Sequence, residues 1–196
     1  MKKNRASDSV NGDMESLLGR WVTIGLCVAL AACSSVNSAL QRERTAIAML
    51  APTEGNTASG VVEFEQDGDE MVVRLRIEGL TPNGVHGLHI HEKGDCRAPD
   101  ASSAGGHFNP TGDRHGGLDS DFRHAGDLGN IRADADGKVE TEFEVTGISL
   151  KAASNSIIGR AVVVHAQADD LVSQPSGNSG PRIACGLISK NPDTFF

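Results

Sequence analysis

Residues 60–78 read GVVEFEQDGDEMVVRLRIE, and this stretch decides the fold class. From Val73 to Glu78 apolar and charged side chains alternate, which is the period of a strand with one buried face. Residues 60–66 also look like a strand, and residues 66–69 (QDGD) carry the Asp and Gly that favour a turn. The stretch therefore predicts two strands joined by a turn.

Further short runs of the same kind occur along the chain, and no window has a convincing helical period. Residues 134–137 (DADG) predict another hairpin turn. Short strands with turn residues between them predict an all-β fold, an eight-stranded antiparallel Greek-key barrel or sandwich. The strands expected are residues 45–51, 60–66, 70–78, 85–91, 128–133, 139–145, 161–164 and 183–188.

Two long segments, residues 92–123 and 169–182, are rich in Gly, Ser and Asp and do not fit strands. Loops of this length in a compact domain usually carry function, so we expect two long functional loops. The chain of 196 residues suffices for one domain with its own core. Its formal net charge of −8 gives no reason to expect binding to nucleic acid.

The N-terminal residues have the features of a targeting segment. An interrupted set of basic residues precedes an apolar run at residues 21–32, which is too short to cross a bilayer. Residues 30–33 read LAAC and resemble the lipobox of bacterial lipoprotein signal peptides. We therefore expect a signal peptide at 1–32, a lipidated Cys33 with a tether at 33–44, and a domain at 45–196.

This interpretation places the protein in the cell envelope, on the periplasmic side, anchored to a membrane through lipid. The alternatives are an ordinary signal peptide with a chance cysteine, giving a soluble periplasmic or secreted protein, or a buried helix. The start of translation is either Met1 or Met14.

Two of the four cysteines, Cys96 and Cys185, remain once the targeting segment is set aside. In an oxidising compartment they are the natural disulfide pair, and the alternative is two free buried thiols.

Six of the seven histidines lie between Val85 and Asp127. Histidine is the commonest metal ligand in proteins. His89 and His91 stand two apart on an expected strand, so both side chains point to one face. His165, at the end of the strand-like run 161–164, could supply a third imidazole; the alternative is a buried histidine with ordinary partners.

A second set of candidate ligands comes from the glycine-rich loop and the strand after it. His107, His115, His124 and Asp127 supply three imidazoles and one carboxylate, the number that a closed tetrahedral zinc site needs. Binding a metal would order a loop that buries little apolar surface. The alternative is a solvated polar loop with scattered histidines.

Six motifs, in order from about Thr45 to Ser189, resemble those of copper/zinc superoxide dismutases. They are GLHIHE at 87–92, GHFNP at 106–110, RHGG at 114–117, RHAGDLGN at 123–130, VVH at 163–165 and PRIACG at 181–186. The resemblance implies an enzyme that converts superoxide to oxygen and hydrogen peroxide. Its redox-active copper would be bridged to a structural zinc by a histidine imidazolate.

The resemblance also implies roles for individual residues. Copper would be bound by His89, His91, His107 and His165, and zinc by His107, His115, His124 and Asp127, so that His107 is shared. Arg182 would orient the superoxide anion. His86 and Asp169 would support the ligands without binding metal, and Cys96–Cys185 would be the family disulfide.

The resemblance leaves three points open: the steering residues, the oligomeric state and an alternative function. The segment 171–180 is uncharged, and Ser176 stands where eukaryotic members have a threonine, so steering residues other than Arg182 are not transferred. Residues 126–130 resemble the dimeric eukaryotic type and suggest a possible homodimer. The main alternative function is a non-catalytic copper- or zinc-binding module on the same fold.

Overall fold

The computed structural model describes residues 43–151 and 153–190. The expected signal peptide and Cys33 lie outside these residues, as does the tether apart from residues 43 and 44. In the described part of the chain, no helix combines the length and the apolar character that crossing a membrane requires.

All eight predicted strands are present, with each end within one residue of the one expected. The element order of the described residues adds a single 3-10 turn, η1, at Ser102–Ala104, which is too short to leave a periodic signal in the sequence. The strands are β1 (Thr45–Pro52), β2 (Ser59–Asp67), β3 (Glu70–Glu78), β4 (Val85–His91), β5 (Asp127–Arg132), β6 (Val139–Thr146), β7 (Ala161–His165) and β8 (Arg182–Ser189).

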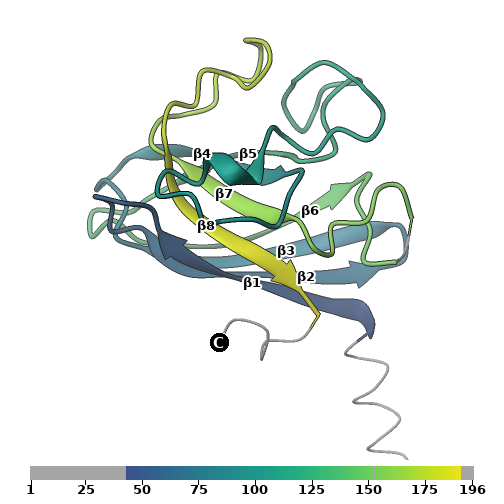
Figure 1. Ribbon diagram of the computed structural model, residues 1–196, viewed down its shortest axis with the longest axis horizontal. Coiled ribbons are helices and arrows are strands. Elements are labelled where there is room, and N and C mark those ends of the chain that lie inside the picture. Colours follow the sequence, from purple (N-terminus) through teal and green to yellow (C-terminus); the bar gives the residue numbers. More distant parts are fainter. Residues whose placement is uncertain (1–42, 152, 191–196) are drawn as a thin grey trace, which may run out of the picture. The chain divides into compact units, whose positions relative to one another are not determined.

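The strands form one antiparallel sheet in the order β5-β4-β7-β8-β1-β2-β3-β6. Neighbours such as β3 and β6, or β4 and β7, are not consecutive in the chain, and this confirms the Greek-key arrangement. Figure 1 shows that the sheet folds over, with β4, β5 and β7 facing β2, β3 and β6.

The core lies between these two halves of the sheet. On β2 and β3 its members alternate with charged residues that are partly or fully exposed, as the pattern of residues 60–78 predicts. Phe64 and Leu75 from one half and Leu88, Ile90 and Val162 from the other belong to the same buried cluster. Burial of these apolar side chains is the main source of stability for the fold.

Strands β4 and β7 differ from the others because they are buried on both faces. On β4, Leu88 and Ile90 point into the core, so His89 and His91 point outward by alternation. On β7, Val164 is in the core, and His165 therefore lies on the outer face. The three imidazoles thus share the outer surface of neighbouring strands.

The long loop after β4 covers that outer surface. A second small apolar cluster, made of Ala101 and Ala104 from the loop and Ala161, Val163 and Cys185 from the sheet, attaches it. The loop returns to the sheet at Gly126, whose N–H donates to Phe108 O at 2.9 Å and whose carbonyl accepts from Ile90 N at 2.8 Å. A Cβ at Gly126 would lie 2.2 Å from Ile90 O, so this close approach needs glycine.

Candidate metal centre

Four imidazoles meet on the outer surface of β4 and β7. His89, His91, His107 and His165, here called the His89 group, are all buried and each offers one ring nitrogen within 4.8 Å of the others. An isolated β-bridge between His91 and His107 brings the loop histidine to the strand. The ring centroids of His89 and His107 are 3.9 Å apart.

The outward ring nitrogens of the His89 group are held by oxygen atoms. His91 Nδ1 donates to Gly105 O at 2.9 Å, and His165 Nδ1 donates to Gly180 O at 3.0 Å. His89 Nε2 donates to a carboxylate oxygen of Asp169 at 2.8 Å. These bonds fix each ring so that its other nitrogen faces the centre of the group.

A second group forms around Asp127, the first residue of β5. His107, His115, His124 and Asp127, here called the Asp127 group, also place one ligand atom each within 4.8 Å of the others. The carboxylate of Asp127 lies 2.8 Å from His107 Nδ1, 3.0 Å from His115 Nδ1 and 3.3 Å from His124 Nδ1. Three imidazoles and a carboxylate thus converge, as the sequence analysis expects.

The two groups share His107, and its two ring nitrogens face in different directions. Nδ1 faces Asp127, whereas Nε2 is buried without a hydrogen-bond partner among the described residues. In the same described part of the chain, His89 Nδ1 is likewise buried without a hydrogen-bond partner, and the buried Nδ1 atoms of His115 and His124 make no hydrogen bond although the Asp127 carboxylate lies nearby. Buried nitrogen atoms without partners are costly, and bound metal ions would satisfy them. The donor set of imidazoles with one carboxylate suits copper and zinc.

Asp169 connects the two groups from outside. Its Oδ2 accepts from His89 Nε2 at 2.8 Å and its Oδ1 accepts from His115 Nε2 at 2.9 Å. The main chain of Asp169 is held in turn by Asn130, which accepts from its N–H at 2.8 Å and donates to its carbonyl at 2.9 Å. The sequence gives no sign of this role for Asn130, because its partner lies 39 positions away in the chain.

Burial is the main influence on the pKa values of His91, His107 and His165. It lowers the pKa of His91 to about 2 and that of His165 to about 3, with neighbouring histidines adding to the effect. Burial also lowers the pKa of His107 to about 4, although the carboxylate of Asp127 opposes the shift. Neutral imidazoles are the form that binds metal.

His115 behaves in the opposite way because it lies between two carboxylates. Burial alone would lower its pKa, but Asp127 and Asp169 outweigh burial and raise the pKa to about 9. Close imidazole N–H groups hold the pKa values of both carboxyls below their usual range, against the effect of burial.

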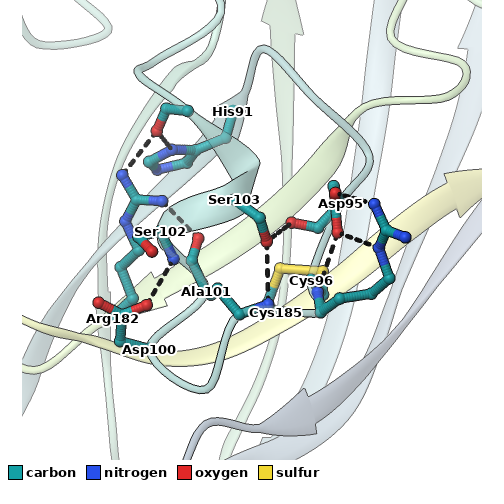
Figure 2. The surroundings of a disulfide bond; sticks show 12 residues. His91, Asp95, Cys96, Asp100, Ala101, Ser102, Ser103, Arg182 and Cys185 are labelled. Carbon is teal, nitrogen blue, oxygen red and sulfur yellow. Dashed lines mark hydrogen bonds and ion pairs between the residues drawn. A yellow bond between two sulfur atoms is a disulfide. The ribbon is translucent and has the colours of Figure 1, made fainter.

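Arg182, the first residue of β8, lines a cavity beside the His89 group. His91, His107, His165 and Ser176 also line that cavity. The guanidinium donates through Nη1 to Ala101 O and through Nη2 to Gly105 O, each at 2.6 Å. Figure 2 shows these bonds next to the disulfide. The cation is thereby held in one place at the cavity wall.

The disulfide between Cys96 and Cys185 is confirmed. It joins the long loop to β8, three residues after Arg182. Ser103 Oγ donates to Asp95 O at 2.7 Å and accepts from Ala98 N at 3.1 Å, which holds the loop in a compact turn around the disulfide (Figure 2). The segment that carries both carbonyl partners of Arg182 is therefore fixed to the sheet.

His86 lies apart from the ligand groups, on the core face of β4. It is buried, and its Nδ1 donates to the main-chain carbonyl of His165 at 2.9 Å. The bond fixes the backbone from which the His165 ring projects. The structure therefore brings together the two expected ligand sets, with Asp169 bonded to two ligand rings and His86 bonded to the main chain of a third ligand.

Comparisons with known proteins agree with this arrangement. Residues 58–188 match the family model described as copper/zinc superoxide dismutase (SODC). A Cu-Zn superoxide dismutase of Paramecium bursaria Chlorella virus 1 is 43% identical over 155 residues, covering 76% of this chain and 81% of that protein. An extracellular Cu-Zn superoxide dismutase of Brugia pahangi is 40% identical over 79% of this chain and 80% of its own length. A Cu-Zn superoxide dismutase of Onchocerca volvulus is 44% identical over 71% of this chain and 94% of its own length.

Proposed function

The chain belongs to the copper/zinc superoxide dismutase family, and from this membership we propose how its residues carry out the disproportionation of superoxide. The observation that carries the proposal is the shared imidazole of His107, with one nitrogen in each of two buried ligand groups. The His89 group is the copper site and the Asp127 group is the zinc site.

When bound, copper supplies one-electron oxidation and reduction of superoxide, while zinc is redox-inert and fixes the orientation and acidity of the shared ring. His107 Nε2 is the atom at which this chain can hold a proton and release it toward the substrate. Each hydrogen peroxide needs two protons, and a proton held on His107 beside the cavity has only a short distance to travel to the substrate. His107 is therefore a catalytic residue as well as a ligand.

Arg182 binds and orients the substrate anion. Its guanidinium lines the same cavity as His91, His107 and His165, and its bonds to two carbonyls hold the positive charge in place. A cation fixed before the reaction stabilises an anion without the cost of rearrangement. Since the chain as a whole has a net charge of −8, the attraction has to be local.

Asp169 and His86 hold ligands rather than metal. Asp169 fixes the rings of His89 and His115, and His86 fixes the main chain of His165. Such outer partners commonly contribute a factor of about 10 to 100 in metal affinity or activity.

The function is tested by following superoxide decay in the presence of purified protein loaded with copper and zinc. We expect rapid consumption with one copper and one zinc per chain, and a large loss of rate in Arg182→Ala at unchanged metal content. A fully loaded protein that does not consume superoxide would instead be a metal-binding module.

We further propose that the domain spans residues 45–196 and is exported as an envelope lipoprotein anchored through Cys33 after removal of residues 1–32. The LAAC motif supports this, and the extracellular Brugia pahangi relative supports export in general. Detergent phase partitioning of the wild type and Cys33→Ser distinguishes the cases. Partitioning of both proteins into the aqueous phase would favour a soluble periplasmic or secreted protein.

We also propose a homodimer, supported by the resemblance of residues 126–130 to the dimeric type. Light scattering of the purified protein should give twice the mass of one chain. A monomer mass at micromolar concentration would contradict it.

A further inference from the structure

The side chain of Gln174 pairs with the main chain of His115. Its Oε1 accepts from the N–H of His115 at 2.9 Å, and its Nε2 donates to the carbonyl of the same residue at 2.9 Å. Nε2 also donates to Val172 O at 3.1 Å. The carboxamide therefore forms a closed pair of hydrogen bonds with one peptide residue, as one strand does with its neighbour in an antiparallel sheet.

This pairing falls on the part of the loop that most needs support. Residues 109–123 contain no helix or strand, so His115 is not positioned by regular secondary structure. The neighbouring Gly116 N–H donates to Asp127 Oδ2 at 3.1 Å, which connects the segment to the proposed zinc site itself. The bonds of Gln174 connect the same segment, at His115, to the second long loop.

The second loop contacts the side chain of His115 as well. Asp169 Oδ1 lies 2.9 Å from His115 Nε2, and Gly177 packs against both residues. His115 is thus held at the ring by Asp169 and at the backbone by Gln174. A ligand fixed at both ends loses little freedom when it binds metal.

We propose that Gln174 is a positioning residue for zinc, which keeps the His115 backbone where the ring nitrogen Nδ1 faces the Asp127 group. This inference rests on the proposed assignment of His115 to zinc. Among the described contacts, Gln174 reaches the ligand groups only at the main chain of His115, and it does not line the cavity beside Arg182, so it acts through His115. Loss of the Gln174 side chain therefore speeds the release of zinc before it affects the release of copper.

The test uses the copper- and zinc-loaded protein and measures the rate at which each metal passes to a chelator in solution. Gln174→Met keeps the length of the side chain but removes both hydrogen bonds to His115 and the one to Val172. We expect zinc to leave roughly tenfold faster, with copper release unchanged at early times. Gln174→Glu keeps the acceptor for the His115 N–H but loses the donor, and it should fall between Met and the wild type.

The control variant is Val172→Ala. Val172 is in the same loop with 73% of its surface exposed, and its main-chain carbonyl, which the substitution keeps, accepts from Gln174. Its zinc release should equal that of the wild type. Cobalt placed in the zinc site gives a second readout, because its visible absorption reports ligand geometry. The bands should shift in Gln174→Met and remain unchanged in Val172→Ala.

Equal zinc release from Gln174→Met and the wild type would overturn the inference. So would equal acceleration of zinc and copper release, since that indicates general loosening of the fold. His115→Ala separates this failure from failure of the proposed function. If His115→Ala still binds one zinc per chain with unchanged affinity, the zinc assignment is wrong; if it loses zinc, only the role of Gln174 is in question.

Discussion

Gly177 lies so close to Asp169 that a Cβ built on it would fall 1.7 Å from the carboxylate oxygen Oδ1. That oxygen is the one that accepts from His115 Nε2, and the same Cβ would lie 2.7 Å from this nitrogen. The backbone at Gly177 also has a φ of +64°. The contact between the two long loops therefore requires a residue without a side chain.

Gly177→Ala should displace Asp169 from His115 and weaken zinc binding by roughly tenfold or more. The measurement is zinc content after dialysis against a chelator. The matched control is Gly55→Ala, where φ is +77° but no atom lies within 4 Å of the new Cβ. Both variants carry backbone strain, so equal zinc loss from the two would contradict the proposed clash.

Asp169→Asn keeps the size of the side chain but removes its charge. It should lower the affinity for both metals, by about 10- to 100-fold, because the rings of His89 and His115 lose their carboxylate partner. Competition titrations with chelators measure this. Asp119→Asn, at an exposed loop position, serves as the control. Loss of one metal alone would show that Asp169 supports only one site.

Arg182→Lys should retain metal and lose most of the rate enhancement. A lysine ammonium cannot form the two parallel bonds to Ala101 O and Gly105 O, so the charge is no longer held in place. Loss of a fixed charge that stabilises an anion commonly costs a factor of about 100 to 1,000. Superoxide decay in the two loaded proteins measures the effect, and an activity equal to the wild type would contradict it.

Reduction of the Cys96–Cys185 disulfide should destabilise the protein and weaken metal binding. The bond closes a loop with a sequence separation of 89 residues. The chain-entropy model gives about 4 kcal/mol for a loop of that size. Urea unfolding and metal retention, with and without reductant, measure both effects. Unchanged metal retention after complete reduction would contradict the idea that the disulfide fixes the ligand loop.

The metal-free protein should be most stable near pH 6.5. His91, His107 and His165 have folded pKa values of about 2 to 4, so their contribution is complete above pH 6.5 and is lost as the pH falls below it. His115 has a folded pKa of about 9, so its contribution is complete below pH 6.5 and is lost as the pH rises through 9. Urea midpoints at pH 5, 6.5 and 9 test this, and a midpoint that keeps rising to pH 9 would contradict it.

The strands and the two ligand sets could be predicted from the sequence for different reasons. Alternation in residues 70–78 is a local signal, and β3 follows it without exception in its second half. The ligands were predicted from imidazole spacing and from resemblance to a family, neither of which gives geometry. The structure supplies what spacing cannot, such as the two directions in which the nitrogens of His107 face.

The residues that sequence reasoning missed make their contacts across long separations. Gln174 bonds to a residue 59 positions away, and Asn130 bonds to one 39 positions away. Gln174 lies in a loop and Asn130 on β5, and a single amide side chain in either place has no periodic or compositional signature. Only the packing of the second long loop against the first loop and against β5 shows that these amides are paired with main-chain groups.

Strand β4 carries the core on one side and the proposed copper ligands on the other. An insertion or deletion of one residue there would exchange the two sides, turning imidazoles toward Leu75 and Phe64 and leucine toward the ions. Such a shift in β4 would therefore abolish both folding and redox chemistry. When β4 packs its apolar side chains into the core, it therefore also orients His89 and His91 toward the proposed copper site.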